Sequence, residues 1–371
     1  MSKVLGTLVL AMVATLVSAE RAFAVDLVVG PAECVPWYPH YQTIQDAVNA
    51  AVPGDTTIYV CPGVYREQVV IQHPMIIQGV DDGSGDPAVI ALPTGGLVPN
   101  VTLARAGSVA AQLVVQDTWG VVLTNLVFDG EGLNCAETVG ASRTAAVALR
   151  NLQSDDPSWI SSYLGHSEIR NHVGGCGRSA SGIIAEASLI EIDNNYIHAL
   201  DGDATDLHGA MVLVTNNYIA ELGFGGAVLS HIENATIAGN TMTELQFGIS
   251  LESSVNINIW SNTLGPWIGY GVYARDNSLS WLDGNNIEAT FFGIWLERSQ
   301  ADRVTNNLFG HTQSIGLIDI ASRGGNEIWD NTFDGSPVGI NIDEGSVAID
   351  NLGPNVFVNV TTWFASSPWP F

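Results

Sequence analysis

Acidic and basic side chains recur at a nearly constant interval in the second half of the chain. Glu252, Arg275 and Glu297 follow one another at almost equal spacing. If one repeat of this length forms one coil of a stacked structure, the three side chains lie in one row along its surface. Paired carboxylates catalyse glycoside hydrolysis, and carboxylates beside a guanidinium can bind sugar hydroxyls. We therefore predict catalytic roles for these three residues and, two coils earlier in the same row, for Asp206.

Aromatic residues accompany this row. Tyr273 and Trp295 each stand two positions before a member of the row, Arg275 or Glu297. We expect both rings to be exposed one coil apart, where their flat apolar faces would stack on sugar rings. The alternative is that the charges form a solvated ladder and that the rings only cover the sheet.

Three more residues are candidates for substrate binding or proton transfer. His208 and His231 stand near matching positions of adjacent repeats, and Arg150 lies upstream of them. Imidazole is the side chain best suited to acid–base work near neutral pH. A solitary surface histidine commonly has no such role, which is the alternative here.

Three carboxylates lie close together between residues 201 and 209. They belong to Asp201, Asp203 and Asp206, and Asp203 stands at a position that is apolar in the other repeats. Such a local break in pattern often marks function, and carboxylate oxygens are the ligands that Ca²⁺ prefers. Ca²⁺ is therefore the candidate cofactor, and no other cofactor is expected. A loop that bulges outward and leaves the acids solvated is the alternative.

These candidates depend on a repeat with a period of roughly 22 residues, which is in the range of solenoid coils. The glycines that mark it are Gly226, Gly248, Gly271, Gly293, Gly316 and Gly339, with Gly182 two periods earlier and Gly202 assigned between. At a nearly fixed distance after each glycine comes an asparagine: Asn195, Asn217, Asn240, Asn262, Asn285, Asn307 and Asn331. Two markers that keep one period indicate a solenoid.

Each repeat contains short segments of alternating apolar and polar residues, such as 248–252 and 255–259, which predict strands. Strands stack about 4.8 Å apart, so a repeat this short can coil once on its predecessor. We expect the asparagines to be structural, because Asn tolerates tight turns and can bond its counterpart one coil away. A leucine-rich repeat is the competing solenoid, but its helical return segment has no counterpart here.

A short amphipathic helix is predicted over residues 41–51, capped by Thr43, with Ile44, Ala47, Val48 and Ala51 on one face. The stretch Thr43-Ile-Gln-x-Ala-Val-x-Ala-Ala-x-x-Gly-Asp55, with Pro62-Gly-x-Tyr65-x-Glu67, resembles the opening of right-handed parallel β-helix proteins of the pectate lyase-like superfamily. That superfamily includes pectin methylesterases, mannuronan epimerases and NosD-like periplasmic proteins. The resemblance implies an all-β, right-handed parallel β-helix with a short N-terminal capping helix.

The resemblance does not extend to the catalytic motifs of these families. The polygalacturonase set, the pectin methylesterase block, the Asp-Pro-His-Asp of the epimerases and the pectate lyase arginine motif are all absent from the sequence. The same opening precedes several chemistries, so it implies a fold and a carbohydrate context but no particular reaction.

Composition limits the partners. The 371 residues carry a net charge of -26, and Lys3 is the only lysine, so every later cation except histidine is an arginine. This charge repels a nucleic-acid backbone, and it disfavours polyanionic glycans such as pectate unless calcium bridges them. Only 13% of residues are charged and 39 are glycine, which argues against a helical bundle.

The N-terminus has the pattern of an export signal. Lys3 precedes an apolar run over residues 4–17, and Ala22-Phe23-Ala24 offers small residues for cleavage. We predict a signal peptide over residues 1–24, with a cut after Ala19 as the alternative. The run is shorter than the ~20 residues of a membrane span, so we expect a secreted protein, periplasmic or extracellular.

Four cysteines remain after cleavage, which in an exported chain favours disulfides. Proximity in sequence suggests Cys34 with Cys61 and Cys135 with Cys176, and free buried thiols are the alternative. No pair of them has zinc-ligand spacing.

The sequence therefore predicts one exported β-helix domain over residues 25–371. It comprises an N-terminal cap and first coil (25–75), repeat coils (100–360) and a C-terminal cap (361–371). Each repeat coil is expected to contain about 22–24 residues, as in other solenoids. We expect the domain to bind a polysaccharide along its outer sheet face, with lyase, hydrolase or epimerase activity as the enzymatic possibilities. The alternative is a non-catalytic surface, adhesive or structural β-helix protein, and a monomer is the default.

Overall fold

The computed structural model describes residues 26–54, 56–134, 138, 140–152, 162–173, 180–209, 211–343, 346 and 351–366. The predicted signal peptide, Cys135 and Cys176 lie outside these residues, as do residues 367–371 of the predicted C-terminal cap. In the part that is described, no helix is both long and apolar enough to cross a bilayer.

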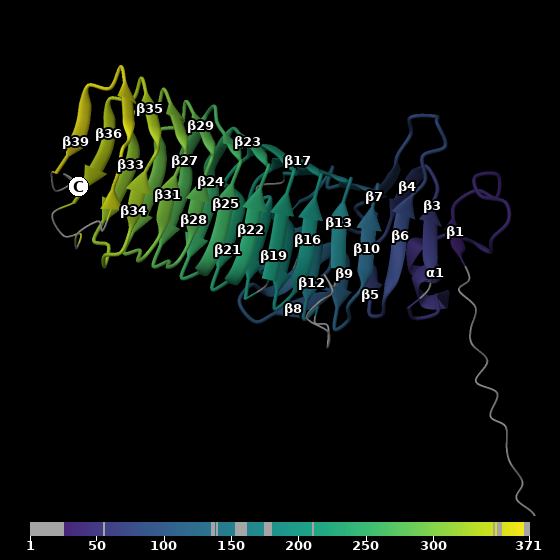
Figure 1. Cartoon of the computed structure of the whole chain (residues 1–371). Helices are drawn as coiled ribbons and strands as arrows, with labels where there is room; N and C mark the ends of the chain where they lie inside the picture. Colours follow the sequence, from purple (N-terminus) through teal and green to yellow (C-terminus); the bar gives the residue numbers. More distant parts are fainter. Residues whose placement is uncertain are drawn as a thin grey trace, which may run out of the picture.

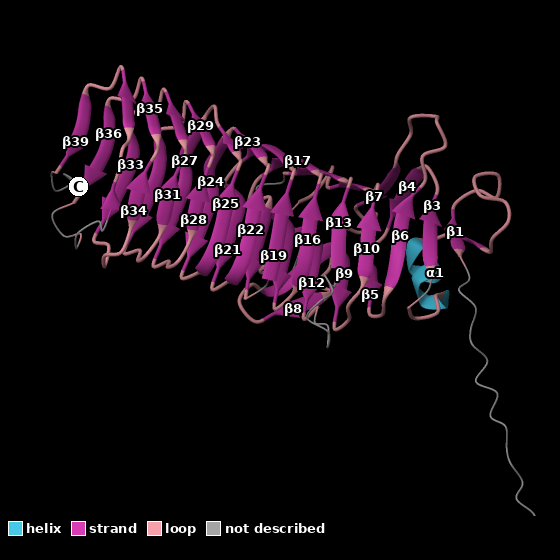
Figure 2. Cartoon of the chain, in the orientation of Figure 1, coloured by secondary structure: helices cyan, strands magenta, loops and turns pink. Residues whose placement is uncertain are grey.

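The chain is a right-handed parallel β-helix in which each coil adds one strand to each of three long sheets. Figures 1 and 2 show the strands stacked side by side, with helix α1 (Ile44–Ala50) at the end where β1 begins and β39 at the other end. Apart from β8, all strand pairs within the sheets are parallel. The predicted fold class is confirmed.

The strands follow the same spatial order in each sheet. Sheet A contains β2 (His40–Tyr41), β1 (Leu27–Val29), β3 (Thr57–Val60), β6 (Met75–Gly79), β10 (Val121–Thr124), β13 (Ser162–Gly165), β16 (Leu189–Asp193), β19 (Met211–Thr215), β22 (Glu233–Ala238), β25 (Val255–Trp260), β28 (Trp281–Asp283), β31 (Arg303–Thr305), β34 (Glu327–Trp329) and β37 (Asn351–Leu352). Sheet B contains β4 (Gly63–Arg66), β7 (Ala88–Ala91), β11 (Val127–Asp129), β14 (Glu168–His172), β17 (Tyr196–Leu200), β20 (Tyr218–Leu222), β23 (Thr241–Thr243), β26 (Thr263–Leu264), β29 (Asn286–Glu288), β32 (Leu308–Gly310), β35 (Thr332–Asp334) and β38 (Val356–Val358). Sheet C contains β5 (Val69–Ile71), β9 (Gly107–Gln116), β12 (Arg143–Arg150), β15 (Ala180–Glu186), β18 (Thr205–His208), β21 (Gly225–Ser230), β24 (Leu245–Glu252), β27 (Ile268–Arg275), β30 (Phe292–Glu297), β33 (Ile315–Ile320), β36 (Val338–Ile342) and β39 (Thr362–Ala365), and β8 (Val101–Leu103) pairs antiparallel with β9.

The interior is an apolar column that runs the length of the helix. Inward side chains of the three sheets form one buried cluster that begins at Leu27 and continues to Ile340. Near the C-terminal end, Phe309 and Phe333 stack with ring centroids 4.6 Å apart. Because each coil buries its apolar side chains against the next, the coils stabilise one another.

The predicted asparagine row is a buried hydrogen-bond ladder between sheets A and B. Asn240 Nδ2 donates to Asn262 Oδ1 (2.9 Å), and Asn262 Nδ2 donates to Asn285 Oδ1 (3.0 Å). The same bonds link the rest of the row, which extends to Asn355. The structural interpretation of these asparagines is confirmed.

The glycine row runs along sheet C where neighbouring backbones approach closely. A Cβ atom on Gly271 would lie 2.6 Å from the carbonyl oxygen of Gly293, so no larger side chain fits. The prediction that Gly202 belongs to this row is wrong. Ala204 takes that position. Thr205, which follows it, pairs with Ile183 and Ala227, and these two directly follow Gly182 and Gly226.

The predicted cap at the N-terminal end is confirmed. The side chain of Thr43 accepts the N–H of Asp46, and the carboxylate of Glu67 accepts the N–H groups of Ile44 (2.8 Å) and Gln45 (2.9 Å). These contacts explain the positions of Thr43 and Glu67 in the motif, because the first N–H groups of a helix lack partners within it.

The first coil is also crosslinked. Cys34 and Cys61 form a disulfide, as predicted, with Cα atoms 6.1 Å apart. At the far end, β39 pairs with β36, and the ring of Trp363 stacks on Phe357 with centroids 5.4 Å apart. The described part of the predicted C-terminal cap is therefore the last strand of sheet C.

The close packing at the glycine row gives a first prediction. Gly271→Ala should lower the free energy of unfolding by about 1–3 kcal/mol, since its Cβ would collide with the backbone carbonyl of Gly293 and with the side chain of Ile287. Gly95→Ala is the matched control because nothing lies within 4 Å of its Cβ position. Urea denaturation followed by tryptophan fluorescence compares the two, and equal midpoints would contradict the packing argument.

Candidate functional site

The outer face of sheet C carries the charged row that the repeat predicts. Its members pair across neighbouring strands in the order Arg150, Glu186, His208, Ser230, Glu252, Arg275, Glu297 and Ile320. Glu252, Arg275 and Glu297 are therefore adjacent, with one residue on each of β24, β27 and β30.

One predicted member of the row is misplaced. His208 occupies the position expected for Asp206, and Asp206 lies instead in a second outward row. The cause is the alignment of Ala204, not Gly202, with the glycines of the neighbouring coils. The second row consists of Ile184, Asp206, Val228, Ser250, Tyr273, Trp295, Ile318 and Asn341.

A β-hairpin covers one end of this face. Its two strands are β8 and β9, and Leu103 of β8 packs in an apolar cluster with Val114, Ala148 and Ile184 of sheet C. At the hairpin tip, the carboxylate of Glu186 accepts the backbone N–H of Arg105 at 2.8 Å and that of the preceding residue. The tip is thereby fixed over the charged row.

The guanidinium of Arg105 joins residues from three strands of the row. Its Nη1 lies 3.0 Å from His208 Nδ1, 3.0 Å from His231 Nδ1 and 2.8 Å from Ser230 Oγ. Its Nη2 lies 3.4 Å from Glu252 Oε2. The two predicted histidines and Glu252 therefore meet around one cation.

Sequence reasoning did not identify Arg105. Two features of the sequence marked it. Lysine and arginine are rare, 12 in all, and Arg105 stands between the short apolar segments 101–103 and 109–115. Those segments could pair as a hairpin, but nothing in the repeat indicated where its tip would lie.

The contact with Arg105 fixes the tautomer of His208. A guanidinium can only donate, so Nδ1 of His208 accepts and its Nε2 carries the proton. Burial lowers the pKa of His208, and the positive charge of Arg105 lowers it further. His208 is therefore a neutral imidazole at neutral pH.

Beside this cluster lies a small recess that holds a second missed arginine, Arg143. Its Nη1 contacts the carboxylate of Asp206, and its Nη2 lies 2.8 Å from Ser181 Oγ and 3.9 Å from Asp203 Oδ2. Asp203 is 2% exposed and also accepts the N–H of Gly225 at 3.0 Å. The recess has a volume of about 180 Å³ and is lined by Leu103, Arg105, Ala106, Arg143, Ile184, Ala185, Glu186, Asp206 and His208.

The expected calcium site at Asp201, Asp203 and Asp206 is not supported by these contacts. The guanidinium of Arg143 supplies the positive charge next to Asp203 and Asp206. Among the described residues, no three His, Cys, Asp or Glu side chains are arranged to hold a metal ion. The alternative of a loop that leaves all three acids solvated is wrong, because Asp203 is buried.

The expectation that Trp295 is exposed is wrong. Trp295 is 8% exposed, because a third outward row of Phe247, Tyr270 and Phe292 flanks it. The centroid of Trp295 lies 5.6 Å from that of Tyr270 and 5.2 Å from that of Phe292. The surface of this aromatic cluster is formed by half-buried rings, Tyr273 among them.

Tyr273 connects the aromatic cluster to the charged row. Its hydroxyl donates to Glu297 Oε2 at 2.8 Å, while Glu297 Oε1 lies 2.7 Å from Arg298 Nη1 and 3.6 Å from Arg275 Nε. Burial raises the pKa of Tyr273, and the charge of Glu297 raises it further, so the phenol stays protonated.

Arg150 lies at the end of the charged row nearest the hairpin, and its guanidinium contacts the carboxylate of Asp117. The bonds from Asn151 and Arg150 lower the pKa of Asp117, so this pair is ionised. Arg150 therefore stands in the predicted row but outside the cluster around Arg105.

Comparison with solved structures agrees with this architecture. The chain superimposes on an exopolygalacturonase from Thermotoga maritima (TM-score 0.60, 11% identity, covering 87% of this chain and 86% of that one). It also resembles a lacto-N-biosidase from Eubacterium ramulus (TM-score 0.59, 10% identity, 90% and 67% coverage) and the A-module of a mannuronan C-5 epimerase from Azotobacter vinelandii (0.55, 16%, 88% and 94%). No curated protein matches the chain.

The three stacked parallel sheets define a right-handed parallel β-helix protein. Residues 165–351 match the family model described as periplasmic copper-binding protein (NosD). The chain belongs to the NosD family.

The donor set of the described residues does not fit a copper ion. Copper is held by imidazole, thiolate and thioether ligands, several of them together. The neighbouring imidazoles of His208 and His231 both direct Nδ1 at the guanidinium of Arg105, whose charge repels a metal ion. We therefore derive no step that involves copper.

Proposed function

We propose that the protein binds a polysaccharide along the outer face of sheet C. The observation that carries this proposal is the register, which places the charged row, the aromatic cluster and the Arg105 hairpin on one face. A ligand that runs along the helix axis would meet polar groups on one side and aromatic rings on the other. The carbohydrate context of the superimposed enzymes supports this class of ligand.

The chemistry of the face matches that of a sugar chain. The partly exposed rings of Phe247, Tyr270 and Tyr273 offer apolar surface to the C–H faces of sugars. Glu252 and Arg275 offer a carboxylate acceptor and guanidinium donors for hydroxyl groups, and both side chains remain more than two-fifths exposed.

The geometry favours binding over hydrolysis. Glu252 and Glu297 are two strands apart, roughly 9–10 Å at the backbone, which is wider than the ~5 Å between the carboxyl groups of a retaining enzyme and near the upper limit for an inverting one. Each is paired with an arginine: Glu252 with Arg105, and Glu297 with Arg275 and Arg298. The carboxylates of Glu252 and Glu297 thus serve better as acceptors for sugar hydroxyls, and Arg275 as a donor.

The proposal includes export and a monomeric protein in the periplasm or outside the cell. The family description is of a periplasmic protein, and the Cys34–Cys61 disulfide suits an oxidising compartment.

Isothermal titration against a panel of neutral and uronic polysaccharides tests the proposal. Arg105→Ala should weaken binding tenfold or more, since hydrogen bonds to charged groups contribute roughly 1.5–3 kcal/mol. Arg66→Ala is the control, because Arg66 is an exposed arginine of sheet B whose contact is a 3.4 Å bond to Leu92 O.

Two results would count against the proposal. If no polysaccharide binds, or if Arg105→Ala and Arg66→Ala bind equally well, the face of sheet C is not the binding site. Reducing-end and unsaturated-product assays on the same mixtures would reveal hydrolase or lyase turnover, which would replace binding as the function.

A further inference from the structure

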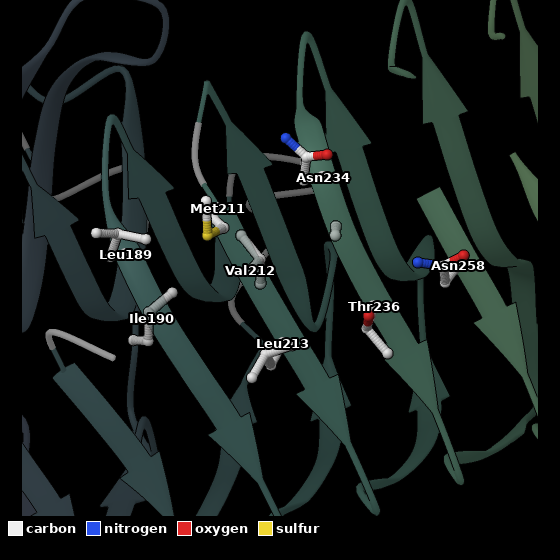
Figure 3. A pocket seen from close by; sticks show the side chains of 9 residues that line it. Leu189, Ile190, Met211, Val212, Leu213, Asn234, Thr236 and Asn258 are labelled. Atoms are coloured by element: carbon white, nitrogen blue, oxygen red, sulfur yellow. The ribbon is translucent and has the colours of Figure 1, made fainter. Parts of the chain in front are cut away.

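A second elongated surface lies on the outer face of sheet A, away from the charged row. Figure 3 shows its first part, where side chains from β16, β19, β22 and β25 line one hollow. Leu189, Met211 and Leu213 give it an apolar floor, and Asn234, Thr236 and Asn258 follow along the helix axis. Its volume is about 230 Å³.

The hollow continues into a second one that is walled by two tryptophans. This part has a volume of about 390 Å³, within the range of small-molecule sites, and is lined by Asn258, Trp260, Trp281 and Asp283. Asn258 belongs to both hollows. Trp260 and Trp281 are each 49% exposed, so both present a large indole surface to solvent.

The tryptophan region is held in place before any ligand arrives. Trp281 Nε1 donates to Thr305 Oγ1 at 2.9 Å, and Thr305 Oγ1 donates to Asp283 Oδ1 at 2.6 Å. Asn306 Nδ2 donates to the same Asp283 oxygen at 2.7 Å. Since the indole and the carboxylate are fixed by one network, binding need not order them.

The charge of the trough (the two hollows together) selects against anions. No lysine or arginine lines either hollow, and Arg303, the cross-strand neighbour of Trp281, is paired with Glu327 at 3.1 Å. Asp283 contributes a carboxylate, and the chain carries a net charge of -26. The other polar groups of the trough are amides and a hydroxyl. These groups hydrogen-bond neutral hydroxyls and attract neither phosphates nor uronates.

We propose that this trough binds a neutral polysaccharide whose sugar rings stack on Trp260 and Trp281. The trough crosses the strands from β16 to β28, four intervals of ~4.8 Å or about 19 Å, which accommodates several sugar rings in a row. A small quaternary ammonium ion would use the indoles and Asp283 but not the amides and the apolar floor. The proposal concerns a different sheet from the proposed function and does not depend on it.

Titration with cellohexaose, xylohexaose, mannohexaose and laminarihexaose tests the proposal, with tryptophan fluorescence as a second readout. At least one hexasaccharide should bind, and more tightly than its disaccharide. Trp260→Ala and Trp281→Ala should each weaken that binding about tenfold. Trp119→Ala is the matched control, because Trp119 is 52% exposed and does not line the trough.

Three results would overturn the proposal: no hexasaccharide binds, choline binds in their place, or both trough variants bind as the wild type does. Trp281→Phe, which keeps a flat ring, should retain more affinity than Trp281→Ala, and unfolding midpoints confirm that each variant is folded. Arg105→Ala should leave hexasaccharide binding in the trough unchanged. Failure at the trough is therefore distinguishable from failure at sheet C.

Discussion

Asn262→Leu should lower the free energy of unfolding by roughly 2–6 kcal/mol, which is the largest effect that we expect from a single uncharged side chain. Asn262 Oδ1 accepts the backbone N–H of Asn240 (3.0 Å) and its side-chain amide (2.9 Å), and Asn262 Nδ2 donates to Ile237 O (2.8 Å). Leucine has a similar size but no polar atoms. It would remove the side-chain partners of the Asn240 N–H and of the Ile237 carbonyl, each at a cost of about 1–3 kcal/mol.

Guanidinium denaturation of the full chain measures this effect. Asn258→Leu is the matched control, because Asn258 lies four positions earlier in the same coil but on the outer face. Its replacement should change the midpoint little. If Asn262→Leu and Asn258→Leu unfold together, the ladder does not hold the corner between sheets A and B.

The parts of the fold that could be predicted are those that repeat. The glycine row and the asparagine row keep one period because each coil must place a close backbone contact and a buried amide at the same point. The capping helix was predictable for a different reason. An exposed first coil requires an amphipathic cover, and the residues of α1 alternate accordingly.

The site was harder to predict because it depends on elements outside the repeat. The β8–β9 hairpin has no counterpart in the other described coils, and its Arg105 contacts Glu252 across 147 positions of sequence. Arg143 reaches Asp206 across 63 positions in the same way. Neither contact leaves a local pattern, so the sequence indicated neither ion pair.

The burial of Trp295 was missed because the strand period changes at the glycine row. In a regular strand, residues an even number apart share a face. Phe247 and Ser250 are three apart, yet their partners Tyr270 and Tyr273 lie in one outer aromatic cluster. The backbone at Gly248 therefore adds one residue to the alternation, and an additional row of rings covers the indole of Trp295.

The distribution of arginines distinguishes the two faces for which we propose different ligands. Arg105, Arg143 and Arg275 all lie on the outer face of sheet C, where each is paired with a carboxylate. The trough on sheet A has no such cation along its lining. Sheet C therefore offers charged donors to a ligand, while the trough offers indoles and amides.

The second large effect is a dependence of stability on pH that originates at Asp302. Its side chain is buried, and its Oδ1 accepts the N–H of Ser280 at 2.8 Å. Burial raises the pKa of Asp302 to about 7, and the neighbouring Asp319 raises it too, whereas the bond from Ser280 acts in the opposite direction. The folded protein thus keeps a proton that the unfolded chain releases near pH 4.

Because the folded pKa lies above the unfolded one, unfolding releases this proton between about pH 4 and pH 7. The contribution of Asp302 is fully favourable below pH 4 and is lost as the pH rises through 7, by up to roughly 1.4 kcal/mol per pH unit. Asp302→Asn keeps the shape without the titration. Its stability relative to the wild type should rise over this range, and at pH 8 it should be the more stable protein.

Denaturation of both proteins at several pH values measures the difference between their free energies of unfolding. The contributions of the other carboxylates are the same in both proteins and cancel. Asp82→Asn is the control, because Asp82 is exposed and bonds from Ser84 lower its pKa. The sign for that residue is opposite, since its contribution is present at neutral pH and lost as the pH falls. If the free energies of unfolding of Asp302→Asn and wild type differ by a constant amount from pH 4 to pH 8, the buried carboxyl holds no proton. The C-terminal coils would then tolerate a charge in their interior.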